Sequence, residues 1–136
     1  MDESKIIDGI VIVNDRDPRE SVVFNFRSWV AIIRAIMVKY AGKTEDEADA
    51  ILMNSWLVEE ALDDYMAIVV RAHDLDYHWA MILAHGECYW WRGIDSREPE
   101  GFWEWEEQYR VDHNLESDDF IFSDEEPAPP IATDAK

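Results

Sequence analysis

Cysteine is almost absent from this sequence, since Cys88 is the only one among 136 residues. A lone cysteine excludes an intramolecular disulfide and favours a reducing compartment. Long apolar runs are absent as well, and no segment approaches the ~20 apolar residues that a membrane-spanning helix needs. The start MDESK has neither the basic region nor the apolar block of a secretory signal. We therefore predict a cytoplasmic protein that contacts no membrane.

Basic side chains are scarce: twelve Lys and Arg stand against 31 Asp and Glu, which gives a net charge of −19 at pH 7. A field of this size repels nucleic acid and anionic membranes, and it speeds encounter with basic proteins. The sequence thus predicts a basic protein partner and no direct contact with nucleic acid. The alternative is that the acidity keeps an aromatic-rich protein soluble or reflects a high-salt habitat.

Motifs for catalysis and for closed metal sites are also missing, because no CxxC, HExxH or ExxH occurs. His78, His85 and Cys88 would share one face of a helix, and so they could reach one metal ion. Closed zinc sites, however, usually draw ligand pairs from two elements. We predict no enzyme, metal or cofactor, and we keep a small metal-binding protein or enzyme built on these three residues as an alternative.

Apolar residues, by contrast, make up 48% of the chain and include seven Trp, which supports a packed core. The length indicates one helical domain over residues 1–114, followed by an acidic tail over 115–136. The stretch Asp74–Gly93 is apolar nearly all round, which predicts an enclosed helix over about 76–92. We expect a mainly α protein: a compact bundle of four to five helices around this central helix. Gly86, in its interior, suggests a close approach by a neighbouring group.

The N-terminal part mixes strand and helix signals. The β-branched residues of segment 5–13 predict a short strand, whose partner is open between Ser21–Phe26, Phe120–Phe122 and another chain. Asp17, Pro18 and Glu20 are typical of a helix start, and apolar residues from Val22 to Tyr40 follow at spacings of four and three. This predicts a helix ending at Gly42. The run at 22–26 keeps a hairpin open.

Three further helices and a tail complete the expected order. The capping box Thr44–Glu47 starts a helix over 45–54, and a second helix is expected over 56–72. A loop over 94–101 precedes a helix over 102–111 that turns Phe102, Trp105 and Tyr109 to the core. The acidic tail should be disordered at least from residue 127. Its Phe120–Phe122 segment either folds back on the core, which we favour, or docks on a partner.

Two acidic surfaces are the candidate partner-binding site. On the expected 56–72 helix, carboxylates pair with like charges one turn apart, and no Lys or Arg lies between Thr44 and Val70. Between Glu98 and Glu126, Arg110 is the only basic residue. Exposed tryptophans within such a rim could anchor a partner. The predicted binding residues are Glu59, Glu60, Asp63, Asp64, Trp91, Trp103, Glu104, Glu106 and Glu107.

The function that fits this pattern is a small acidic, non-enzymatic binding protein that inhibits a basic, nucleic-acid-acting protein. Its carboxylates would stand where phosphates stand in the nucleic acid. Immunity proteins and DNA mimics are analogous in charge and size, although no motif of either group is present. The alternative is a secretion-type or assembly chaperone, a homodimer joined through the seam of Val22–Tyr40 that holds another chain against its strand.

Overall fold

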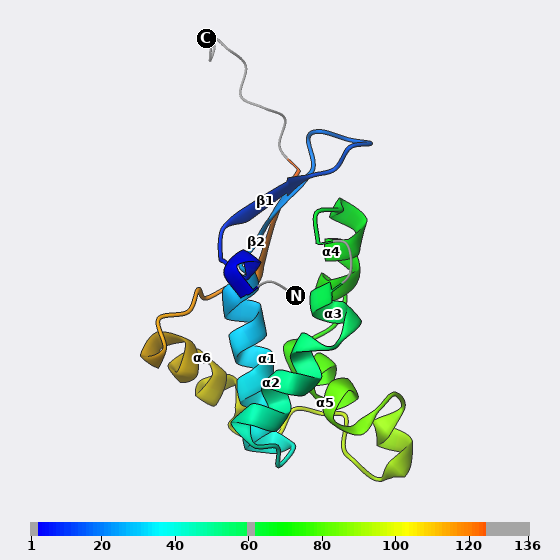
Figure 1. Ribbon diagram of the computed structural model, residues 1–136, viewed down its shortest axis with the longest axis vertical. Coiled ribbons are helices and arrows are strands. Elements are labelled where there is room, and N and C mark those ends of the chain that lie inside the picture. Colours follow the sequence, from blue (N-terminus) through cyan, green and yellow to red (C-terminus); the bar gives the residue numbers. More distant parts are fainter. Residues whose placement is uncertain (1–2, 60–61, 125–136) are drawn as a thin grey trace.

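The computed structural model describes residues 3–59 and 62–124, and in this part of the chain helices predominate over one small sheet (Figure 1). This confirms the mainly helical prediction with an N-terminal strand. The sheet has three strands, which is more than the sequence indicated. No described helix combines the length and apolar character needed to cross a membrane. The elements are η1 (Glu3–Lys5), β1 (Ile10–Val13), β2 (Ser21–Phe24), α1 (Phe26–Tyr40), α2 (Glu45–Met53), α3 (Trp56–Glu59), α4 (Tyr65–Ala72), α5 (Asp76–His85), η2 (Tyr89–Arg92), α6 (Phe102–Asp112) and β3 (Phe120–Ser123).

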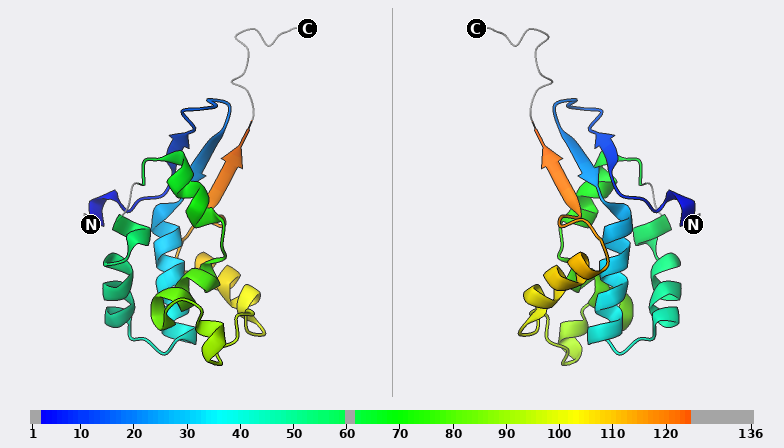
Figure 2. Two further views of the ribbon diagram at one scale, coloured as in Figure 1. Left: turned by 90° about the vertical axis from the view of Figure 1, so that its right-hand side faces the viewer. Right: turned by 90° about the vertical axis from the view of Figure 1, so that its left-hand side faces the viewer.

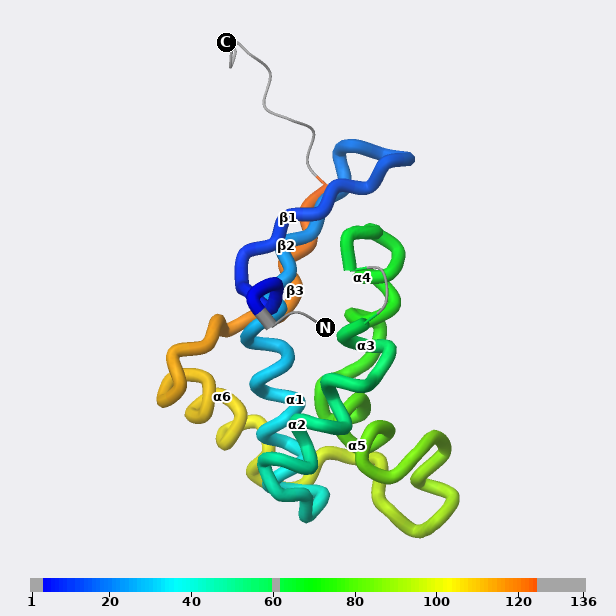
Figure 3. The backbone as a smooth tube through the Cα atoms, viewed as in Figure 1, coloured from blue at the N-terminus to red at the C-terminus, as the bar shows by residue number. Residues whose placement is uncertain are grey.

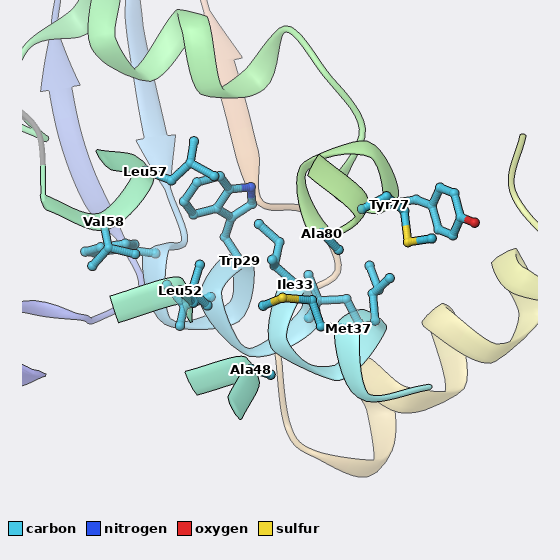
Figure 4. Packing of buried hydrophobic residues seen from close by; sticks show 14 of the residues in the cluster. Trp29, Ile33, Met37, Ala48, Leu52, Leu57, Val58, Tyr77 and Ala80 are labelled. Atoms are coloured by element: carbon cyan, nitrogen blue, oxygen red, sulfur yellow. The ribbon is translucent and has the colours of Figure 1, made fainter. Parts of the chain in front are cut away.

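The central helix is α1, not the 76–92 segment. Helix α1 packs against α2, α5 and α6, and Trp29, Ile33 and Ile36 on it are fully buried. Figure 4 shows Trp29, Ile33 and Met37 between side chains of α2 and α3 on one side and of α5 on the other. The seam that we predicted for a homodimer is therefore occupied by the chain's own core.

Helix α1 begins eight residues later than predicted, because the start signals at 17–20 build a turn. The backbone N–H of Asn14 donates to the carbonyl of Glu20 at 2.9 Å, and Asp17 Oδ1 accepts from the N–H of Arg19 at 3.2 Å. The β-branched residues that follow form β2 instead of helix, with Val22 and Phe24 buried. The hairpin alternative was thus the correct one.

Strand β2 lies at the centre of the sheet and pairs antiparallel with both β1 and β3. Both segments of this chain that were considered as partners of the N-terminal strand, Ser21–Phe26 and Phe120–Phe122, therefore contribute strands to the same sheet (Figure 3). The ring of Phe120 stacks on that of Phe24 with centroids 5.0 Å apart, so Phe120 folds back on the core. Residues 115–124 are part of the described structure, whereas the expected disorder from 127 lies outside the described residues.

The capping box that starts α2 is confirmed. Thr44 Oγ1 accepts from the N–H of Glu47 at 3.1 Å, and Glu47 Oε1 accepts from the N–H of Thr44 at 2.9 Å. The predicted 56–72 helix is instead two helices, α3 and α4, and Asp64 caps the second by accepting from the N–H of Ala67 at 3.2 Å. Buried Arg71 ties α4 to α3, because its Nε donates to the carbonyl of Leu57 at 2.8 Å.

The predicted 76–92 helix is also shorter. Helix α5 ends at His85, because Gly86 has φ 93° and ψ 167°, outside the helical region. Residues 89–92 then form η2, so Gly86 breaks the helix and is not a site of close packing within it. The predicted helix over 102–111 is confirmed as α6, with Phe102 buried and Trp105 and Tyr109 packed against the core.

Candidate partner-binding site

Helix α6 presents its apolar side to the core and leaves a row of carboxylates outside. Phe102 and Trp105 pack against the ring of Tyr40 from α1, with centroids 5.7 and 5.5 Å apart. This anchoring fixes the rotation of the helix about its axis. Glu104 and Glu107 are therefore exposed, and Trp103 lies on the solvent side with 52% of its surface accessible.

Arg110, the only basic residue between positions 98 and 124, is buried and fully engaged. Its Nη2 lies 3.1 Å from Asp76 Oδ2 and 3.2 Å from Glu106 Oε2, and its Nη1 lies 2.9 Å from Asp119 Oδ1. The guanidinium thus joins α5, α6 and the segment before β3. It contributes no positive charge to the outer surface of α6.

Two of the carboxyl groups around Arg110, those of Asp76 and Glu106, are held where charge is costly. Burial raises the pKa of Asp76 well above its usual value, and the charge of Asp119 and a hydrogen bond with it raise this pKa further, against the opposing effect of Arg110. Burial also raises the pKa of Glu106. One guanidinium shared among three carboxyl groups leaves the cluster acidic.

Two hollows meet at Trp103. One, of about 240 Å³, lies between α5, α6 and the start of β3, over the Arg110 cluster. The other, of about 430 Å³, runs along α6. Trp103, Glu106 and Arg110 line both. We call the second hollow the α6 groove; its lining residues are Trp103, Glu106, Glu107, Arg110, Val111, Leu115 and Ser117.

The α6 groove combines apolar walls with an acidic rim. Val111 is 70% exposed and Trp103 half exposed, so both offer apolar surface to a partner. Around them the exposed charged side chains between positions 98 and 124 are all acidic, because Arg110 is buried. Such a surface attracts cations and can also bury the apolar stem of a long basic side chain.

The other predicted carboxylates do not form the expected helix face. Glu59 ends α3, Asp63 is exposed in the following turn, and Asp64 serves as the N-cap of α4. Glu60 lies outside the described residues. Figure 1 shows α3 and α4 on the opposite side of α1 from α6, so the two acidic surfaces are separate. Their binding role stays a prediction.

Trp91, the other predicted anchor, is 78% exposed on η2. The guanidinium of Arg92 donates to the backbone carbonyls of His85 and Glu87 and so holds this turn against the end of α5. Figure 1 places the turn and α6 on opposite sides of the helical part. Trp91 is thus accessible but does not belong to the α6 groove.

The residues of the metal hypothesis are not brought together as predicted. The helix break at Gly86 places Cys88 outside α5, with φ 57°. His78 lies 3.3 Å from Asp74 Oδ1, and its ring lies at centroid distances of 5.7 Å from Tyr89 and 6.1 Å from Trp90. Among the described residues, no group of three or more His, Cys, Asp or Glu could hold a metal ion.

Sequence reasoning missed the partners of Arg110. Residue 76 was expected only as the first residue of the 76–92 helix and residue 119 only as part of the acidic tail, yet Asp76 and Asp119 lie beside the same guanidinium. The available signal was Arg110 itself, because an isolated basic residue in an acidic segment is expected to pair with carboxylates in the interior.

Comparisons with protein-family models, with curated proteins and with solved structures find no match for this chain.

Proposed function

We propose that this chain is a non-enzymatic binding protein that captures a basic protein through the α6 groove and blocks its nucleic-acid-binding surface. The observation that carries the proposal is the pairing of exposed Trp103 and Val111 with a rim whose exposed charges are all acidic. Neither an apolar patch nor a charged helix alone would suggest this partner. Together, the apolar surface matches the methylene stem of arginine or lysine, and the acidic rim matches its charged head.

The groove is suited to a basic side chain in three respects. The indole of Trp103 offers a π face, on which a guanidinium gains about 0.5–2 kcal/mol. The side chain of Val111 can pack against the methylene stem. The exposed carboxylate of Glu107 lines the same hollow and can accept from the charged head.

The spacing of the exposed carboxylates on α6 indicates which kind of surface the partner would present. Glu104 and Glu107 lie one helical turn apart, and residues at this spacing are about 5–6 Å apart between Cβ atoms. A protein that binds nucleic acid presents Lys and Arg to successive phosphates, and this row of carboxylates can engage the same side chains. The captured protein would then lose access to nucleic acid.

The test begins with capture of basic proteins from host lysate by the tagged full chain at low and at roughly molar salt. We expect a basic nucleic-acid-binding protein that is released by high salt. The double variant Glu104→Gln with Glu107→Gln, and separately Trp103→Ala, should each weaken binding of the purified partner at least about tenfold. Added duplex DNA should compete with this chain for the partner.

The matched control is Glu59→Gln with Asp63→Asn, which removes the same two charges from the other acidic surface. Under the proposal this variant binds as the parent does. Equal weakening by both double variants would indicate a general charge effect and no α6 site. A partner held through the α3–α4 surface alone, or one that binds DNA and this chain together, would overturn the proposal.

A further inference from the structure

Strand β1 has an open outer edge. It is the first strand in the order β1-β2-β3, and no described residue pairs with its other side. Asn14 is hydrogen-bonded to Glu20, and bonding alternates along an antiparallel pair, so Ile10 and Ile12 direct their backbone groups to β2. The N–H and C=O groups of Val11 and Val13 therefore point outward along the edge.

Nothing within β1 guards this edge. Edge strands are usually protected by a proline, an inward-pointing charge or a bulge, and Ile10–Val13 contains none of these. Val11 is 64% exposed and Val13 47% exposed. Figure 2, right, shows the uncovered face of the sheet, with α4 behind it. The other edge strand, β3, is flanked by the exposed carboxylates of Asp118 and Asp124, whose charge protects it.

We propose that β1 pairs antiparallel with β1 of a second copy of this chain, which joins the two sheets across a twofold axis. Several registers bring outward-pointing groups together, and we choose the one that uses both outward-pointing residues of β1. In it Val11 bonds with Val13 of the second copy and Ile12 lies on the axis. The β-branched side chains of the two strands then form cross-strand pairs.

The distribution of charged residues favours a second copy of this chain, and not a basic protein, as the partner of β1. Two chains of net charge −19 repel each other over most of their surfaces, yet residues 1–43 hold seven of the twelve basic side chains and only six of the 31 acidic ones. Strand β1 lies in this nearly neutral part. The six acidic side chains of this part are balanced by seven basic ones, so it attracts a basic partner less strongly than the acidic surface of α6 does.

The ends of the paired strands are also compatible. Asp8, just before β1, lies 3.3 Å from Arg27 and accepts hydrogen bonds from Ser28, so its charge is already compensated. The carboxylate of Asp8 therefore brings no uncompensated charge to the end of the paired strands.

Sedimentation equilibrium of the full chain tests the proposal. The parent should reach twice its 16.0 kDa mass as concentration rises. The double variant Val11→Lys with Val13→Lys should weaken association at least about tenfold, because the register sets lysine opposite lysine. The matched control is Ile121→Lys with Ser123→Lys. It adds the same charge at exposed positions of β3 on the same face of the sheet, and it should dimerise as the parent does.

Complementary charges provide the second measurement. The variant Val11→Glu with Val13→Glu should fail to associate alone, and it should form a mixed dimer with the lysine variant. A parent that stays monomeric, a β3 control that dissociates as the β1 variant does, or a lysine and glutamate mixture without a mixed dimer would each overturn the proposal. Partner capture by the α6 groove should persist in the β1 variants, so the two proposals fail separately.

Discussion

Asp76 and Arg110 lie 34 residues apart in the chain, yet Asp76 Oδ2 and Arg110 Nη2 are 3.1 Å apart in the folded protein. Arg110 is buried and only 10% of the Asp76 side chain is accessible, and Glu106 and Asp119 complete the cluster. The same guanidinium holds α6 against α5 and removes the one basic charge that would otherwise interrupt the acidic surface of α6. Stability and the character of the groove therefore depend on one residue.

Replacing Arg110 with Met should lower the free energy of unfolding by about 3–5 kcal/mol at pH 7, because three carboxyl groups then lose their cation while remaining buried. Urea unfolding followed by circular dichroism measures this. Arg97→Met, at an exposed pair with Asp95, is the control and should unfold as the parent does. An Arg110→Met protein as stable as the control would show that the cluster carries no stabilising charge interaction.

The raised pKa of Asp76 predicts a pH dependence of defined sign. Because burial and the nearby Asp119 raise this pKa above the ordinary 3.8, the fold favours the protonated carboxyl. The protonated carboxyl of Asp76 contributes fully to the free energy of unfolding below about pH 3.8. This contribution is lost as pH rises through the higher pKa that Asp76 has in the folded state. The parent should therefore lose stability relative to Asp76→Asn as pH increases from about 4.

Urea unfolding of both proteins from pH 4 to pH 8 measures this difference. Asp112→Asn, which removes an exposed charge from α6, controls for the loss of one negative charge and should follow the parent. A constant gap between the parent and Asp76→Asn across this range would contradict a raised pKa at position 76.

Local signals in the sequence identified some elements well. The capping box at Thr44 and Glu47 needs only residues three positions apart, and it forms as predicted. The start signals at Asp17 and Pro18 were misleading, because the same residue types also build turns and the β-branched residues after them pair as a strand. Pairing with β1 and β3 decided between strand and helix for these β-branched residues.

The candidate site could be predicted only in part. Trp103, Glu104 and Glu107 are on the surface as expected, because the inward side of α6 is plain from its aromatic spacing. The Arg110 cluster depends on contacts across 34 and nine residues, which no local pattern contains. Likewise, the expected acidic face of residues 59–64 fails because the chain turns between α3 and α4 and Asp64 becomes a cap.

Asp64 and Asp63 should respond differently to alanine. Asp64 accepts a hydrogen bond from the N–H of Ala67 at the start of α4, and loss of such a cap costs about 1 kcal/mol. Asp63 is exposed and caps no helix, so Asp63→Ala should change the free energy of unfolding by less than about 0.5 kcal/mol. Urea unfolding of both variants measures the difference, and equal values would contradict the capping role.

Gly86 offers the sharpest distinction between the helix expected over 76–92 and the observed break. With φ 93° and ψ 167° its backbone is almost confined to glycine, and an added Cβ would lie 3.3 Å from Nη2 of Arg92. Gly86→Ala should therefore destabilise the protein by about 1–3 kcal/mol. Gly93→Ala, also at positive φ but with open space around its Cβ, should cost less, about 1 kcal/mol. If α5 instead continued through Gly86, alanine would stabilise it by about 1 kcal/mol and raise the helical signal at 222 nm. Urea unfolding with circular dichroism separates the two cases by the sign of the change.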